Sequence, residues 1–214
     1  MTKSRTLTDI FSFLKKDDWK DDHESFFIAG LGNPGKEYEN NRHNIGFMAL
    51  NRFVKKYGET FSKYEKKGLI AKFQVENNRL ILVKPQTFMN LSGQAIGPLV
   101  RYYKIPLDNV LITYDDIDLP FGAIRIRPSG GAGGHKGLSS VINKLGTNNF
   151  PRMRLGIGRP PGNQNAANYV LKNFSPSETD TLEIVLENSC EAMQVFLRDG
   201  IEAAMNKFNT SVVL

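Results

Sequence analysis

The feature that most constrains the fold is an alternation, from Phe26 onward, of short apolar segments with longer segments of helical periodicity. Short apolar runs bounded by turn residues are typical of buried strands, whereas apolar residues at intervals of three and four indicate helices packed on a sheet. The expected strands cover residues 26–31, 69–75, 79–83, 110–114, 123–127 and 154–157. The expected helices cover residues 45–57, 91–103, 136–145 and 177–208. This order predicts an α/β fold.

Two of the expected strands, 69–75 and 79–83, are separated only by Glu76-Asn77-Asn78, which predicts an antiparallel hairpin. Most other strands are separated by helical segments long enough to allow parallel pairing. We therefore expect a single domain with a mixed, mostly parallel sheet that is flanked by helices on both faces.

Residues 1–25 are expected to form an N-terminal extension, and residues 26–214 the domain itself. Leu7, Ile10 and Leu14 fall on one helical face, and an acidic cluster at residues 17–22 ends this pattern, so the extension is expected to be helical. Because the extension starts with basic residues, a mitochondrial-type presequence is an alternative. The acidic cluster that follows favours a docking helix over a long transit peptide.

Composition excludes several classes of protein. The 214 residues contain no apolar run of the roughly 18 to 20 residues that a membrane span needs, and no secretory signal is apparent. A single cysteine, Cys190, cannot form an internal disulfide, and with three histidines it cannot supply a His/Cys zinc site. We expect a cytoplasmic monomer without a metal or a cofactor.

The net charge of +6 is unevenly distributed. Residues 119–177 carry basic side chains and no acidic one. The basic residues in this segment are Arg125, Arg127, Lys136, Lys144, Arg152, Arg154, Arg159 and Lys172. Clustered Lys and Arg bind polyanions by neutralising phosphates and releasing counterions, so the segment indicates a nucleic-acid partner. On charge alone, a solvated basic face remains an equal alternative.

Two glycine-rich stretches resemble nucleotide-binding loops without matching them. Gly30 to Gly35 has the letters of a dinucleotide-binding turn, but Pro34-Gly35 indicates a turn instead of a helix start. We expect this turn to present Asn33 from the end of a strand. The stretch from Ser129 to Gly137 lacks the Lys-Ser/Thr pair of a P-loop, and its glycines indicate a loop that approaches a ligand closely and moves as a lid.

Acidic and imidazole groups sit where α/β sheets carry catalytic residues. Asp115, Asp116 and Asp118 follow an apolar strand, and their spacing leaves three alternatives open: a Mg²⁺ site, a carboxylate that orients a histidine, or a capped turn. His43 precedes an apolar helix, and it can meet Asp115, Asn33 and Asn90 if the strand ends converge. A histidine paired with a carboxylate is a competent general base near neutral pH. Because no nucleophilic serine or cysteine motif is present, water is the expected nucleophile.

Several motifs occur together in a fixed order. They are Gly30-Leu31-Gly32-Asn33-Pro34-Gly35, Tyr38, Asn41-Arg42-His43-Asn44, Lys84-Pro85, Thr87-Phe88-Met89-Asn90-Leu91-Ser92-Gly93, Asp115-Asp116-Ile117-Asp118-Leu119-Pro120 and Gly133-Gly134-His135 with Gly137-Leu138. From about Phe26 to about Asn206 this pattern resembles the bacterial-type peptidyl-tRNA hydrolase family, which cleaves the ester between a peptide and the terminal ribose of tRNA.

The resemblance implies roles for individual residues. His43 is implied as the base that activates water, Asp115 as its orienting acid, and Asn33 and Asn90 as groups that hold the peptide and the attacked carbonyl. The resemblance also implies that Met89 and Tyr38 line the cleft and that the loop with His135 covers it. Arg127 and Arg154 are implied as a basic pair on the 5′ phosphate of tRNA, with the acceptor stem and CCA end as the bound parts.

One position departs from the family pattern. Lys136 stands where the family usually has asparagine, in a position associated with contacts to substrate amides. Because lysine cannot accept a hydrogen bond, binding of a phosphate of the CCA end is the alternative role for Lys136. The departure also keeps a catalytically idle RNA-binding relative, similar to a chloroplast splicing factor, as an alternative. A nucleotide-dependent oxidoreductase built on the glycine turn is a further alternative.

Overall fold

The computed structural model describes residues 24–209, which form one seven-stranded sheet with the strand order β2-β3-β4-β1-β5-β7-β6. The strands are β1 (Ser25–Gly30), β2 (Lys63–Glu65), β3 (Gly68–Val75), β4 (Asn78–Pro85), β5 (Val110–Asp116), β6 (Ile124–Arg127) and β7 (Arg152–Gly156). The helices are α2 (Ile45–Lys56), α3 (Gly93–Tyr102), α4 (Lys136–Leu145), α5 (Ala166–Val170) and α6 (Thr179–Phe208).

The sheet is mixed, as predicted, but it is not mostly parallel: three of its six strand pairs are parallel and three are antiparallel, and the parallel part is central. β1 pairs in parallel with β4 and β5, and β5 pairs in parallel with β7. The antiparallel pairs lie toward the two edges, where β3 pairs with β2 and β4, and β6 with β7. The predicted hairpin is confirmed as β3 and β4, with Val75 opposite Asn78. Consequently β4, β1, β5 and β7 end at the same edge of the sheet.

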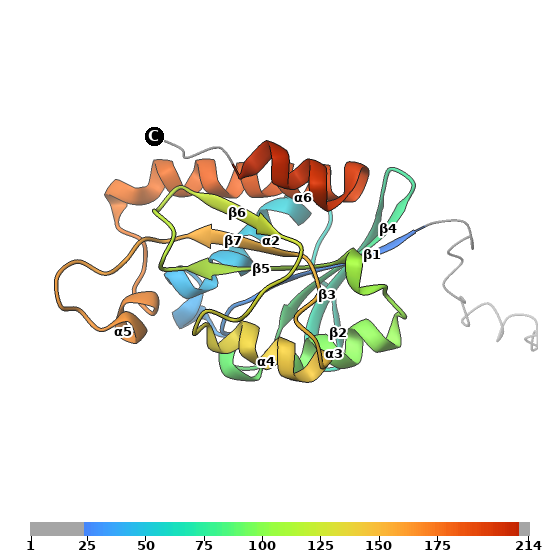
Figure 1. Ribbon diagram of the computed structural model, residues 1–214, viewed down its shortest axis with the longest axis horizontal. Helices are drawn as coiled ribbons and strands as arrows, with labels where there is room; N and C mark the ends of the chain where they lie inside the picture. The colour runs from blue at the N-terminus through green and yellow to red at the C-terminus, as the bar shows by residue number, and fades with distance from the viewer. Residues whose placement is uncertain (1–23, 210–214) are drawn as a thin grey trace, which may run out of the picture.

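Helices cover both faces, also as predicted (Figure 1). On one face, α2 and α6 pack against a core that includes Ile28, Phe53 and Phe196. On the other face, α3 and α4 pack against a core that includes Phe27 and Val141. Phe27 and Ile28 are neighbours in β1, and the alternation of side chains along a strand sends each to a different core.

Three structural features were not predicted. Strand β2 is short, polar and at the edge of the sheet, so it has no apolar alternation to reveal it. Helix α5 spans only five residues and is capped by Asn165, whose side chain accepts hydrogen bonds from Ala167 and Asn168. Helix α6 was predicted as continuous, but Gly200 adopts a φ of 82° and kinks it. The helix expected around residues 7–14 lies outside the described residues.

Candidate active site

The candidate site lies beyond the common carboxyl-terminal edge of the parallel strands. Asp115 belongs to the end of β5, Asn33 follows β1, and Asn90 follows β4. His43 lies in a single 3-10 turn, Arg42–Asn44, directly before α2. Segments far apart in the chain therefore reach one place, which is where α/β sheets of this kind bind ligands.

A close approach of two glycines positions the His43 turn against the sheet. A Cβ atom added to Gly30 in β1 would lie 2.3 Å from the backbone oxygen of Gly46 in the first turn of α2. A Cβ atom added to Gly46 would lie 2.6 Å from the backbone oxygen of Thr113 in β5. Because neither residue has a side chain, α2 begins almost in contact with both strands, which brings His43 to the end of β5.

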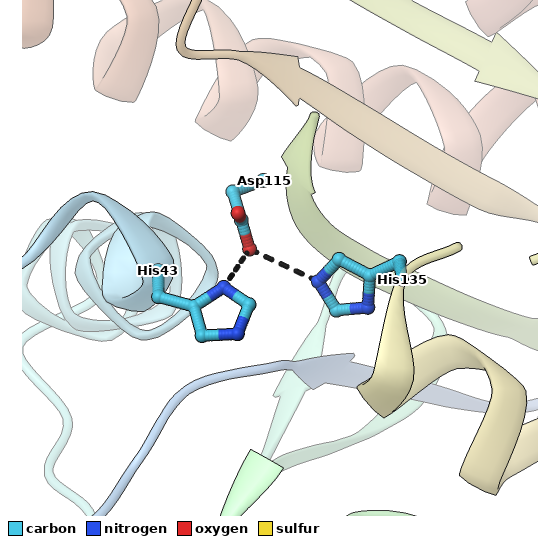
Figure 2. Close-up of side chains that lie close together, drawn as sticks. All are labelled: His43, Asp115 and His135. Atoms are coloured by element: carbon cyan, nitrogen blue, oxygen red, sulfur yellow. Dashed lines mark hydrogen bonds and ion pairs between the residues drawn. The ribbon is translucent and has the colours of Figure 1, made fainter. Parts of the chain in front are cut away.

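Asp115 is shared by two histidines (Figure 2). The same carboxylate oxygen, Oδ1, lies 2.8 Å from Nδ1 of His43 and 3.0 Å from Nε2 of His135. The carboxylate side chain is only 2% exposed. Burial alone would raise the pKa of Asp115, but the two imidazoles that face it hold the pKa well below its usual range. Asp115 is therefore an ionised acceptor at neutral pH.

The hydrogen bonds assign different proton positions to the two histidines. The backbone N–H of Leu138 donates to Nδ1 of His135 at 3.0 Å, so the proton of this ring is on Nε2, which donates to Asp115. Both nitrogens of His135 are thus engaged. His43 donates to Asp115 through Nδ1, which leaves its Nε2 as an unprotonated acceptor. Figure 2 shows this nitrogen pointing away from Asp115, and His43 lines the adjacent cleft.

The side chain of Asn33 is oriented by its neighbours. Its Oδ1 accepts a 2.8 Å hydrogen bond from the backbone N–H of Met89, so its Nδ2 is the group left to donate toward the cleft. Asn44 holds the backbone of Asn33 from both sides, accepting from its N–H at 2.8 Å and donating to its carbonyl at 2.9 Å. Asn44 follows His43 directly, so these bonds fix Asn33 and the His43 turn relative to each other.

Arg42, on the other side of His43, fixes the turn to a distant segment. Its Nη2 donates to both carboxylate oxygens of Glu178, at 2.9 and 2.7 Å. Its Nη1 donates to the backbone oxygens of Lys172 and Asn173, and its guanidinium carbon lies 4.5 Å from the centre of the Tyr169 ring. This buried arginine thereby links the His43 turn to the chain around α5.

These groups surround a cleft of about 580 Å³. Its walls include the residues expected to contact substrate: Asn33, Tyr38, Met89, Asn90, His135 and Lys136. Val170 and Leu171, at the end of α5, and Phe88, which is 59% exposed, add apolar side chains to the lining. The cleft thus combines apolar side chains with amide and imidazole groups.

The glycine-rich loop lines the cleft, but it is tied at its start. Arg152, a buried member of the acid-free segment, donates from Nη1 to the backbone oxygen of Gly130 and from Nη2 to that of Asn148 at 2.6 Å. Arg152 therefore holds the start of the loop through hydrogen bonds, and its buried guanidinium is not available to bind RNA. The resemblance implied that the loop with His135 covers the cleft and that His135 contacts substrate, but the direct bond of His135 to Asp115 was not predicted.

Arg127 and Arg154 lie on one face of the antiparallel strand pair β6 and β7. Arg154 lies opposite Arg125 in the strand register and Arg127 lies opposite Arg152, so all four side chains start from the same side of the sheet. Arg127 is exposed, while Nε of Arg154 donates to Oδ2 of Asp116 at 2.6 Å. Arg125 belongs to this basic face and was not singled out from the sequence.

The three neighbouring carboxylates have separate partners. Asp115 accepts from the histidines, Asp116 from Arg154, and Asp118 from Arg159. They therefore do not converge on one point, as the Mg²⁺ alternative requires. Within the described residues, the ring nitrogens of His43 and His135 with a carboxylate oxygen of Asp115 form the group that could hold a metal, with ligand atoms within 4.8 Å of one another. In the hydrogen-bonded arrangement, the proton on Nδ1 of His43 and the proton on Nε2 of His135 occupy the space between these atoms that a metal ion would need.

The turn after β1 excludes the dinucleotide arrangement. Gly35 has a φ of 118° and leads into a short 3-10 turn, Lys36–Tyr38, and the next α-helix begins only at Ile45. No helix start faces a pyrophosphate site at the third glycine. Within residues 24–209, no helix combines the length and the apolar character needed to cross a bilayer.

Comparison with known proteins agrees with this geometry. The family model described as Peptidyl-tRNA hydrolase matches residues 27–213. The chain belongs to the peptidyl-tRNA hydrolase family. A peptidyl-tRNA hydrolase of Chloroflexus aggregans is 47% identical over 185 residues, which cover 86% of this chain and 98% of that protein. A chloroplastic peptidyl-tRNA hydrolase of Arabidopsis thaliana is 45% identical over 86% of this chain and 65% of its own length.

A solved structure of the family has the same fold. The crystal structure of peptidyl-tRNA hydrolase from Acinetobacter baumannii superposes with a TM-score of 0.82 at 32% identity, over 87% of this chain and 95% of that one. The resemblance inferred from the motifs is therefore confirmed, as is the fold class. Arg42 and Asn44 belong to the same family motif as His43, and this adjacency was the signal available for them in the sequence.

Proposed function

We propose that this chain hydrolyses the ester that joins the peptide to the terminal ribose of peptidyl-tRNA, with His43 as the general base. The observation that carries the proposal is the hydrogen bond from Nδ1 of His43 to the buried carboxylate of Asp115, which leaves Nε2 free at the cleft. His135 offers no comparable nitrogen, because both of its ring nitrogens have partners.

The reaction follows from these proton positions. Nε2 of His43 takes a proton from water while the water oxygen attacks the acyl carbon, and Asp115 stabilises the imidazolium that forms. In this proposal the Nδ2 group of Asn33 and the amide of Asn90 donate to the developing oxyanion, where one good donor is typically worth about 2.7 to 4 kcal/mol. The acyl–oxygen bond then breaks, and the imidazolium returns its proton to the ribose oxygen. The products are the peptide carboxylic acid and the free 3′ end of tRNA.

We propose further that the acceptor stem lies on the basic face of strands β6 and β7, with Arg127 and Arg154 on the 5′ phosphate. The absence of acidic residues between 119 and 177 supports this placement of the RNA. Contacts of this kind position RNA through phosphates and shape. The CCA end is then directed toward the cleft, where Tyr38, Met89 and Lys136 contact the end of the substrate.

The catalytic unit is proposed to be residues 26–214, acting as a monomer, with residues 1–25 as an extension. We propose the cytoplasm as the location; two relatives, from plants, are named chloroplastic and mitochondrial. Light scattering of the purified chain tests the first proposal, and fractionation of cells of the source organism tests the second.

Hydrolysis of purified N-acetylaminoacyl-tRNA in ¹⁸O-labelled water tests the main proposal. We expect catalytic turnover with one ¹⁸O atom in the released carboxylate and none in the tRNA. RNA binding without cleavage would instead support the idle RNA-binding relative, which the retained His43–Asp115 pair does not favour.

A further inference from the structure

A second cavity of about 580 Å³ lies beside the catalytic cleft. It shares Asn90, Ala132, Gly134 and Lys136 with the cleft, and it extends between α3 and α4. Its remaining walls carry hydroxyl, amide and ammonium groups, from Gln94, Ser139, Ser140, Asn143 and Lys144. The lining of this cavity is therefore more polar than that of the cleft, and Lys136 belongs to both.

The charge around this second cavity is positive. The two helices that form its walls, α3 and α4, contain no acidic residue. Neither Lys136 nor Lys144 has an ion pair among the described residues. At its edge, the ammonium group of Lys67 donates to Oε1 of Gln94 at 2.8 Å, which adds a third cation. By contrast, α6 on the opposite face of the sheet carries six acidic and two basic residues.

An anion is the ligand that fits such a cavity, because each lysine can only donate and no neighbouring carboxylate competes. The identity of the anion rests on the proposed function. A substrate whose ester lies at His43 continues, on the 5′ side of its terminal ribose, into single-stranded RNA with one phosphate for each nucleotide. A positively charged groove beside a binding site is the usual way to hold such a strand. The peptide, whose backbone is neutral, has the apolar side chains of the cleft available instead.

We propose that this second cavity binds a backbone phosphate of the single-stranded 3′ end of tRNA, with Lys136 and Lys144 as its cationic residues. Lys144 is thereby a specificity-determining residue for the RNA part of the substrate. Its stem packs on α3, where Gly97 leaves room for it: a Cβ atom at Gly97 would lie 2.9 Å from Cγ of Lys144. This packing restricts the side chain before any ligand binds, which lowers the entropic cost of holding a phosphate.

Two model substrates test the proposal in the full chain. One is the N-acetylphenylalanyl ester of adenosine, which has no phosphate, and the other is the same ester of the trinucleotide CpCpA. We expect the unmodified chain to have a higher kcat/KM for the trinucleotide ester. Lys144→Gln should lower kcat/KM for that ester by on the order of 10-fold, the typical effect of one lost charged hydrogen bond. Lys144→Arg, which keeps the charge, should restore most of it.

The matched control is Lys55→Gln, an exposed lysine on α2 at the opposite face, which changes the net charge equally. We expect no change in the preference between the two esters for this control. Equal losses on both esters for Lys144→Gln, or an unchanged preference for the trinucleotide, would overturn the cavity assignment. Absence of hydrolysis of both esters and of intact peptidyl-tRNA by the unmodified chain would instead refute the proposed function, so the two failures are distinguishable.

Discussion

Replacement of Asp115 by asparagine removes one charge and little else. Both histidines bond to the same oxygen, Oδ1, and the amide oxygen of asparagine can accept both of these hydrogen bonds. The proton on Nδ1 of His43 and the proton on Nε2 of His135 can therefore stay in place. What disappears is the negative charge that faces the imidazolium formed on His43 during water attack.

The magnitude follows from the distance and the burial. With Nδ1 of His43 at 2.8 Å from the carboxylate oxygen, the charge centres are ~4 Å apart, which is worth about 4 kcal/mol at an effective dielectric constant of about 20. This energy corresponds to a roughly 10³-fold slower chemical step. The assay is single-turnover hydrolysis of N-acetylaminoacyl-tRNA at saturating enzyme and neutral pH.

The control for this prediction is Asp118→Asn. Asp118 is a nearby carboxylate whose side chain is 49% exposed, so solvent screens its charge and we expect less than about a 3-fold change in rate. If Asp115→Asn retains a rate within about 3-fold of the unmodified chain, the charge of Asp115 does not stabilise the reaction, and the reasoning is refuted.

Four further predictions concern stability, RNA binding and the extension. Arg42→Lys keeps the charge but loses the bidentate bond, so we expect about 2 kcal/mol lower stability, or a Tm about 4–8 °C lower by calorimetry, together with a lower kcat. Burial raises the pKa of the Cys190 thiol to about 12, so the thiol's contribution to stability is complete below about pH 9 and declines as pH rises toward 12. Above pH 9, the Tm of the unmodified chain should therefore fall more steeply with pH than the Tm of Cys190→Ala. Replacing Arg127 and Arg154 together should flatten the logarithmic salt dependence of tRNA binding by about 0.7 to 0.9 for each lost phosphate contact, and an unchanged slope removes them from the interface. A chain beginning at Glu24 should keep its full hydrolytic rate, and a large loss would assign the extension a catalytic role.

Most of the fold could be predicted because its strong signals are local. The helix at 136–145 was predicted with the bounds that α4 has, since a glycine cluster precedes it and Gly146 adopts the left-handed conformation that ends it. The hairpin of β3 and β4 followed from two adjacent apolar runs. Strand β2 could not be predicted in this way, because its position depends on pairing with β3 and not on its own polar sequence.

The site was only partly predictable because its geometry depends on distant contacts. Family motifs pointed to His43, Asp115 and Asn33, and the structure brings these residues to one edge of the sheet. Spacing alone could not show that His135 shares a carboxylate oxygen with His43, since their segments approach Asp115 from opposite sides of the sheet. The support that Arg42 receives from Glu178 is likewise invisible before the chain folds, because 136 positions separate the two residues.

The central claim is that Nε2 of His43 activates the attacking water. Its most direct test is the single-turnover rate of His43→Gln on saturating peptidyl-tRNA, measured beside the binding constant of the same variant. We predict that the rate falls by roughly 10²- to 10⁴-fold while binding changes by less than about 3-fold. Hydrolysis by this variant at the rate of the unmodified chain would contradict the account.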